Sequence, residues 1–428
     1  MKIIIHILLL VFLTFESYSL NIEDTIKSTI ENNPKVKIAI EKLVESKELM
    51  IYAKGAKLPT VSSTISGTYK TADTTTTTSS TTPETITEAY QLTISQNLYD
   101  AGFNDLEIER SKILFNDELI NFKSTIQDLI LDAIEGYLIV INYEKFLEAT
   151  KKNYDSVLKG FEEIKTRFDL GSATLYDLQE AQASFATVST NLFASEKNFE
   201  ISKKSFQRIV GLNAINLEDI LEINSLISLD QILFNALKKN LNLHLLSNEI
   251  KNNEILILKE KKTKKPSIDL SGTGLYSYGS RLESGTETTS GSIALTLTIP
   301  LFQKGQDDSN IRKYHSQLLQ SEMSLEDAKD DLQILIENTF KDFKISEAKM
   351  SSNLIIIQSI ETALKSMREE YNIGTKSITD LVNEEEKLLN VNVNYLNSKK
   401  DFLLNYFKLK SLDGTLIQLF EKYLPEIN

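Results

Sequence analysis

Length, composition and charge already exclude several classes of function. The chain has 428 residues, no cysteine and a formal net charge of -13, which excludes disulfides and thiolate metal sites and argues against nucleic acid as a partner. The acidic balance fits a solvated surface, and it also fits a lumen that disfavours anions.

Residues 1–19 show the order of features of a secretory signal. Lys2 comes first, 3–15 is almost wholly apolar, and the small residues Ser17 and Ser19 follow. This order predicts a signal peptide, with a single N-terminal anchor as the alternative. No later stretch approaches the 18 consecutive apolar residues of a spanning helix. An exported soluble protein or an outer-membrane barrel therefore remains.

Two segments alternate between apolar and polar side chains, as β-strands with two unlike faces do. Their apolar positions are Tyr90, Leu92, Ile94 and Leu98 in the first segment and Ile293, Leu295, Leu297, Ile299 and Leu301 in the second. A weaker strand pattern precedes each, which predicts β-hairpins at about 59–98 and 266–301. Alternation over about ten residues suits a transmembrane strand with lipid on one face and a lumen on the other. A globular sheet with one wet face is the alternative.

The segments that join these strands cannot build a core. Residues 72–88 are rich in Thr and Ser, and 281–290 are rich in Gly, Ser, Thr and Glu. Such composition predicts mobile exposed loops, which would face the outside of the cell at the tips of barrel hairpins.

Long helices are predicted where proline is absent. No proline lies between Pro83 and Pro266 or between Pro300 and Pro425, so helices are permitted over about 101–210 and 305–413. Apolar side chains occupy every seventh position at Leu119, Ile126, Ala133, Val140, Leu147, Tyr154, Phe161 and Phe168. This period indicates coiled-coil-like packing. An ordinary long coiled coil would show it as well.

The chain contains an internal repeat. Pro59, Gly67 and Tyr69 recur at one constant offset as Pro266, Gly274 and Tyr276, and a second offset relates Leu98, Gly102, Gly171, Asp177, Asn191 and Gly211 to Leu301, Gly305, Gly374, Asp380, Asn394 and Gly414. We therefore predict repeat 1 over 20–225 and repeat 2 over 226–428, each with a helix, a β-hairpin and long helices.

Four strands pose a physical problem in a membrane. Unpaired strand edges cannot sit in hydrocarbon, and four strands are too few to close around a lumen. Closure therefore requires several chains. Three copies would give twelve strands, within the range of known barrels, although two or four copies would also close.

Motifs at matching places in the two repeats resemble the TolC-type outer-membrane efflux proteins over nearly the whole mature length. One pair is 97–102 (NLYDAG) and 299–305 (IPLFQKG). The other pair is 167–171 (RFDLG) with 177–182 (DLQEAQ) and 371–376 (YNIGTK) with Asp380-Leu381.

The resemblance implies an α+β membrane protein. A homotrimer would form a 12-stranded β-barrel in the outer membrane, continued through the periplasm by a barrel of long helices. An equatorial belt would come from 213–229 and from the segment after Gly414. The implied function is a channel-tunnel of a tripartite efflux or type I secretion system. The implied partners are a periplasmic adaptor, an inner-membrane transporter and outer-membrane lipid, without nucleic acid.

The resemblance also implies a periplasmic gate. Tyr371 and Lys376 correspond to the family's locking tyrosine and arginine, and Asp177 corresponds to the carboxylate that they hold. Lys376 lacks the bidentate geometry of arginine. Gly171 and Gly374 lie in turns between helices, where the adaptor would make contact. The alternative is an ordinary surface contact for each residue, with Asp177 stabilising a helix N-terminus.

The implied pore constriction follows the second turn. Asp380 corresponds to the first carboxylate of the family's entrance ring, and Asn383 stands where some members carry a second. A ring of one carboxylate per chain should attract cations and disfavour anions. Glu384 and Glu385 come next, and the sequence leaves open whether they face the lumen.

No catalytic, metal or cofactor site is predicted. His244 and His315 lie in helical contexts without neighbouring ligands, and the chain has no G-x-S-x-G, P-loop or H-E-x-x-H pattern. Two alternative functions are a periplasmic adaptor protein, which has a single helical hairpin flanked by strands, and an exported coiled-coil structural protein, which has no need of lipid-facing strands. The sequence leaves open the cargo, the identity of the pump and of the adaptor, and any role of the Thr-rich loop.

Overall fold

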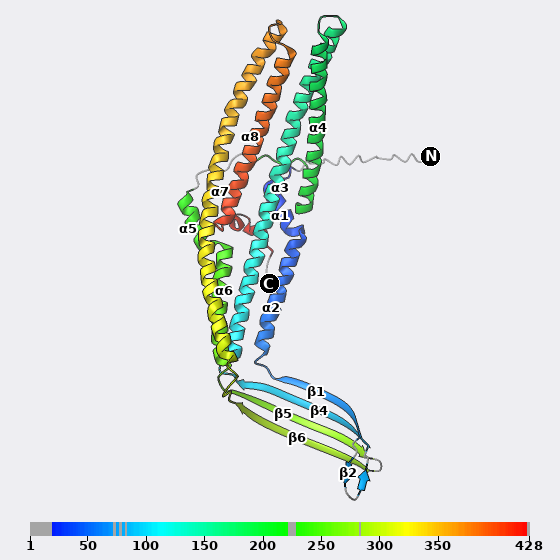
Figure 1. Ribbon diagram of the computed structural model, residues 1–428, viewed down its shortest axis with the longest axis vertical. Helices are drawn as coiled ribbons and strands as arrows, with labels where there is room; N and C mark the ends of the chain where they lie inside the picture. The colour runs from blue at the N-terminus through cyan, green and yellow to red at the C-terminus, as the bar shows by residue number, and fades with distance from the viewer. Residues whose placement is uncertain are drawn as a thin grey trace, which may run out of the picture. The chain divides into compact units, whose positions relative to one another are not determined.

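The computed structural model describes residues 19–71, 74–76, 79–81, 84–220, 228–281 and 284–425 (Figure 1). The signal expected over 1–19 therefore lies, apart from Ser19, outside the described residues. The strands of the main sheet are β1 (Thr60–Thr71), β4 (Glu84–Tyr99), β5 (Ser267–Arg281) and β6 (Ser284–Thr298). The helices are α1 (Ile22–Asn32), α2 (Pro34–Gly55), α3 (Phe103–Asp169), α4 (Leu175–Val210), α5 (Leu229–Lys239), α6 (Leu241–Lys262), α7 (Gln306–Asn372), α8 (Ile378–Leu412) and α9 (Leu416–Leu419), followed by the 3-10 turn η1 (Glu421–Tyr423).

The long helices α3 and α7 are continuous and have the same length, 67 residues each. The seven-residue pattern therefore predicts α3 correctly. Its seam is fully buried in the middle, where Ile126, Ala133 and Val140 are at most 2% exposed, and half-buried toward both ends.

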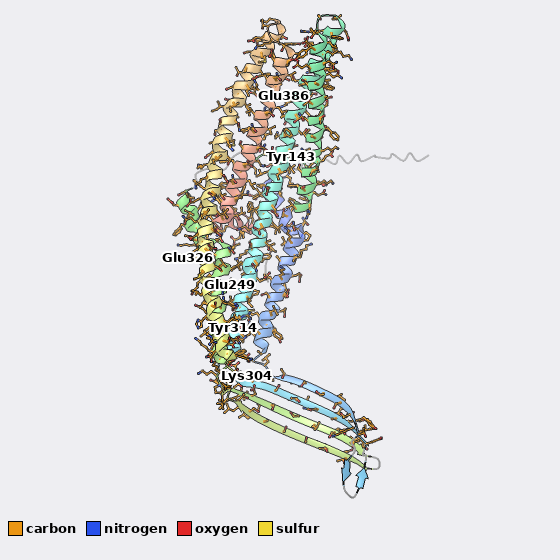
Figure 2. The ribbon with its side chains drawn as sticks, in the orientation of Figure 1. Tyr143, Glu249, Lys304, Tyr314, Glu326 and Glu386 are labelled. Carbon is orange, nitrogen blue, oxygen red and sulfur yellow. The ribbon has the colours of Figure 1, made fainter. Side chains whose placement is uncertain are left out.

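Left-handed backbone residues mark the ends of elements at equivalent places in both repeats. Gly171 and Gly374 end α3 and α7, with φ of 75° and 82°. Each strand enters the following helix through two left-handed residues, and the first of the two is a non-glycine, Ala101 or Lys304. Figure 2 labels Lys304 at the junction between β6 and α7. The repeat is thus one of backbone geometry as well as of sequence.

The sheet has the antiparallel order β1-β4-β5-β6. Its register places Val61 beside Ile94, Ile94 beside Gly272, and Gly272 beside Ile293, so apolar side chains share one face. The other face is rich in Ser and Thr. Residues on both faces are exposed in the single chain: Val61 at 65% and Ile293 at 85% on the apolar face, and Ser292 on the other. The apolar face therefore lacks a packing partner among the described residues.

The loops expected over 72–88 and 281–290 are shorter in the structure, because β4 begins at Glu84 and β6 begins at Ser284. Two short strands, β2 (Thr74–Thr76) and β3 (Ser79–Thr81), pair antiparallel with Thr75 opposite Ser80. Threonine is a good strand former, which explains why a polar tract can pair here. The remaining positions of the tract, 72–73, 77–78 and 82–83, lie outside the described residues.

The chain divides into two compact units, and each contains parts of both repeats. The sheet unit comprises Ile40–Asn121 and Asn242–Ala328, and the helical unit comprises the segment up to Ala39 with Phe122–Leu241 and Lys329–Asn428. The repeats are therefore not separate compact domains, because β4 of repeat 1 pairs along its length with β5 of repeat 2.

Within the sheet unit, ion pairs join the beginning of α3 to the end of α6. Glu107 of α3 accepts from Lys259 of α6 at 2.5 Å and pairs with Arg110 at 3.2 Å. In the part of the chain that the structure describes, no helix has the length and apolar character needed to cross a membrane.

Candidate functional site: the helix turns of the helical unit

Four helices meet beside the two helix turns of the helical unit (Figure 1). Ile164 of α3, Ala181 of α4, Tyr371 of α7 and Ile378 of α8 form one buried cluster, each at most 8% exposed. Each of these four helices contributes one buried side chain, so movement of any one of them disturbs the cluster. This is the place where the sequence predicts a gate.

The two turns have the same construction. The first closes with bonds from Gly171 N to Phe168 O at 2.9 Å and from Ser172 N to Arg167 O at 2.7 Å. The second closes from Gly374 N to Tyr371 O at 3.0 Å and from Thr375 N to Glu370 O at 2.9 Å. A Cβ atom added to either glycine would meet nothing within 4 Å, so the glycines are needed for their positive φ.

The residue after each turn begins the next helix with a capping box. Thr174 accepts from Asp177 N at 3.1 Å, and Asp177 accepts from Thr174 N at 2.9 Å. Ser377 and Asp380 repeat this arrangement at 3.1 Å and 3.0 Å. A reciprocal pair of this kind satisfies two backbone donors that a helix start leaves free.

These bonds keep both carboxylates charged. The Thr174 side chain, helped by the Thr174 backbone, lowers the pKa of Asp177. The Ser377 backbone and side chain lower the pKa of Asp380, with a smaller contribution from the charge of Lys376. Both residues remain partly exposed. Asp380 can therefore present a negative charge near the turn at neutral pH while it caps α8.

Tyr371 is buried among partners that the sequence pattern does not indicate. Its ring lies 5.3 Å from the guanidinium carbon of Arg167, which itself bonds Glu163 at 2.5 Å. The Tyr371 hydroxyl is buried and makes no hydrogen bond of good geometry among the described residues. Burial, with a further contribution from the neighbouring Glu163 carboxylate, raises the pKa of Tyr371 to about 12.

The three side chains of the expected clasp do not bond one another in the described chain. The Asp177 carboxylate bonds Thr174, Tyr371 lies against Arg167, and Lys376 acts on Asp380 by its charge alone. The clasp therefore stays a prediction. Asn383 is exposed, as a pore-facing residue must be in an isolated chain.

The structure gives Glu384 and Glu385 different surroundings. Glu385 is buried, at 6% exposure, and bonds Ser156 of α3 and Arg368 of α7. Glu384 instead pairs with Lys387 on its own helix at 2.8 Å. Sequence reasoning missed this cluster, because an acidic run gives no signal of which member points inward.

The comparisons with known proteins decide the family. The sequence profile of the outer membrane efflux protein family matches residues 25–212 and 236–415. The chain belongs to this family. Its two matched segments correspond to the two repeats, and the match confirms the resemblance stated from the motifs.

Relatives and solved structures agree with the family. The chain is 22% identical to outer membrane protein TolC of Vibrio cholerae over 417 residues, which cover 92% of this chain and 91% of that protein. It is 21% identical to the alkaline protease secretion protein AprF of Pseudomonas aeruginosa over 425 residues, or 95% and 87% of the two chains. The Campylobacter jejuni CmeC outer membrane channel has a TM-score of 0.77 at 16% identity and covers 94% of this chain and 90% of its own.

The family fixes the fold class and the place of action. As an outer membrane efflux protein, the chain is an outer-membrane channel of the efflux and secretion type that extends into the periplasm. The fold is that of outer membrane channels, with a four-stranded sheet and long helices built from two repeats. The alternatives of a periplasmic adaptor and of an exported coiled-coil structural protein are therefore wrong.

Proposed function

We propose that this protein is the outer-membrane tunnel of a tripartite export system. It would passively conduct substrates that an inner-membrane transporter delivers through a periplasmic adaptor. One observation carries the proposal: the sheet presents lipid-type alternation and leaves both of its edges, β1 and β6, without a partner strand among the described residues. Such edges are not tolerated in hydrocarbon unless another chain pairs with them.

Identical copies can close this sheet. Four antiparallel strands leave β1 and β6 running in opposite directions, so β1 of one copy can pair antiparallel with β6 of the next. This is a head-to-tail contact, which closes into a ring when the rotation fits. The family resemblance supports a homotrimer with twelve strands, although edge pairing alone would also allow two or four copies.

The turns are the proposed place of adaptor contact and of gating. Gly171 and Gly374 present exposed apolar neighbours, Leu170 at 78% and Ile373 at 76%, which supports contact with a protein partner. The gate would use the clasp of Asp177, Tyr371 and Lys376 across copies or after rearrangement. The constriction would use Asp380 and Asn383.

The nature of the cargo is left open by the relatives. One of them is named for protease secretion and the family for efflux. Both uses fit a tunnel that does not itself select its substrate.

Assembly and conductance test the proposal together. We expect the protein from outer-membrane fractions to run as a band of about three chains without heating and as a single chain after heating. In planar bilayers it should give small closed-state currents with brief openings. A monomeric periplasmic protein without conductance would overturn the proposal, and a dimer or tetramer that conducts would correct only the number of copies.

A further inference from the structure

A buried carboxylate joins three helices of the helical unit, a short distance along α8 from the turn. The Glu385 side chain of α8 is 6% exposed. It accepts from Arg368 Nη2 of α7 at 2.8 Å and from the hydroxyl of Ser156 of α3. Figure 2 labels Glu386, the next residue along the chain, on α8.

Glu385 occupies a position where the packing calls for an apolar residue. It follows Ile378 by one seven-residue period, and Ile378 belongs to the buried cluster at the turns. A carboxylate at a buried coiled-coil position costs stability unless its partners are in place. Such residues fix the register of neighbouring helices, because only one arrangement satisfies them.

The partners of Glu385 make the bond sensitive to movement of α8. Arg368 and Ser156 come from two other helices, so a shift of α8 against either helix breaks a bond. Glu384 differs, because its partner Lys387 lies on α8 and travels with it. The side chain of Arg368 is 55% exposed, so water can solvate the guanidinium when the bond breaks. The buried carboxylate would then be left without its cation, which is unfavourable.

Repeat 1 has no counterpart to this junction. The residue at the position equivalent to Glu385 is Gln182 of α4, which is exposed. The junction therefore holds α8, and its equivalent in repeat 1, α4, has no such contact at this position among the described residues. The two repeats thus differ here as well as at the turns.

We propose that Glu385 is a second fastening point of the gate, which holds α8 in its closed register against α3 and α7. The proposal rests on the proposed channel function. Opening would require α8 to leave Arg368 and Ser156, so the junction adds a barrier beyond the turn residues. It is distinct from the expected clasp, since it contains none of Asp177, Tyr371 and Lys376.

The test measures closed-state conductance of the assembled channel in bilayers. Arg368→Gln leaves the carboxylate buried without its cation, and we expect closed-state conductance to rise about tenfold, within the range of coupling between residues in contact. Glu385→Gln should give a smaller rise. In the double variant the increase in conductance should be smaller than the product of the two single increases, because both substitutions remove the same ion pair.

Glu384→Gln is the matched control and should conduct like the parent. Ser156→Ala keeps the ion pair and is the milder variant if Arg368→Gln does not assemble; it should give a detectable rise. A conducting parent whose Glu385→Gln and Ser156→Ala forms behave like Glu384→Gln would overturn the second fastening point alone. A parent that does not conduct would overturn the channel proposal and this gating role with it.

Discussion

At the scale of single residues, Tyr371 shows that a side chain selected by resemblance can have an unexpected environment. Its hydroxyl is buried without a hydrogen bond of good geometry, and its ring lies against Arg167. A buried hydroxyl without a partner costs about 1–3 kcal/mol. The equivalent residue in repeat 1 is Phe168, so the hydroxyl is a property of the second repeat. This unfavourable free energy would make the closed state easier to leave, as a gate residue that exchanges partners requires.

The first prediction concerns Tyr371→Phe and alkaline pH. The pKa of Tyr371 is raised to about 12, so the folded chain holds this proton at a pH where the unfolded chain, with a pKa near 10, has released it. The associated stability is complete below pH 10 and is lost as pH rises toward 12. Tyr371→Phe should therefore unfold at an unchanged or slightly higher temperature at pH 7 and lose less stability than the parent at pH 11.

Thermal unfolding of the detergent-solubilised protein at several pH values measures this difference. Lysine titration affects parent and variant alike, so the comparison isolates the tyrosine. Tyr52→Phe is the control, because Tyr52 is 82% exposed. Parallel pH profiles for the parent and Tyr371→Phe would contradict the buried position of the hydroxyl.

At the scale of elements, the strands carry a two-faced pattern that can be tested at neighbouring positions. Ile293 and Ser292 are adjacent in β6, lie on opposite faces and are both exposed in the single chain. The register places Ile293 with Gly272 and Ile94 on the apolar face, and Ser292 with Thr273 on the other.

We predict that an arginine prevents assembly in the membrane at position 293 and is tolerated at position 292. Ile293→Arg should cost up to about 2–4 kcal/mol of membrane stability, as arginine does on the lipid face of a barrel. Ser292→Arg should assemble normally, because a lumen solvates the charge. The measurement is the fraction of heat-modifiable oligomer in outer-membrane preparations. Equal loss in both variants would mean that the sheet is not two-faced toward lipid and water.

Much of the element order could be predicted from the sequence for physical reasons. Period two and period seven are direct consequences of strand and helix geometry, and proline-free stretches allow 67-residue helices. The capping boxes were also available, because Thr174-x-x-Asp177 and Ser377-x-x-Asp380 have the spacing of that motif. The short pair β2 and β3 does not follow from composition, because a lack of core-forming residues says nothing about strand propensity.

The contacts around the candidate gate could not be predicted in the same way. Which of Glu384, Glu385 and Glu386 turns inward depends on the rotation of α8 within the bundle. Neighbouring residues of a helix point about 100° apart, and the acidic run itself contains no pattern that fixes this rotation. The same holds for Tyr371, whose neighbours Arg167 and Glu163 lie on another helix.

At the scale of the whole molecule, the duplication does not give two domains. Each compact unit takes segments from both repeats, and the sheet is continuous across them. The equivalent turns at Gly171 and Gly374 therefore lie in the same unit. Differences in sequence between the repeats can give these two turns different contacts. Lys376 stands where repeat 1 has Ala173, and Glu385 stands where it has Gln182. In a symmetric assembly these differences would repeat in every copy, so the second repeat would control the pore.

The last prediction uses this difference between the repeats. Asp380→Asn removes a charge but keeps an oxygen that can accept from Ser377 N, so the helix start should survive. If Asp380 lines the constriction, each copy loses one negative charge, and the cation-to-anion permeability ratio in bilayers should fall toward one. Asp177→Asn makes the same chemical change at the equivalent cap of repeat 1. It should leave the permeability ratio as in the parent and, if the clasp forms in the assembly, raise closed-state conductance. A ratio that is unchanged in Asp380→Asn would remove Asp380 from the pore, and a ratio that falls equally in both variants would place both caps on the conduction path.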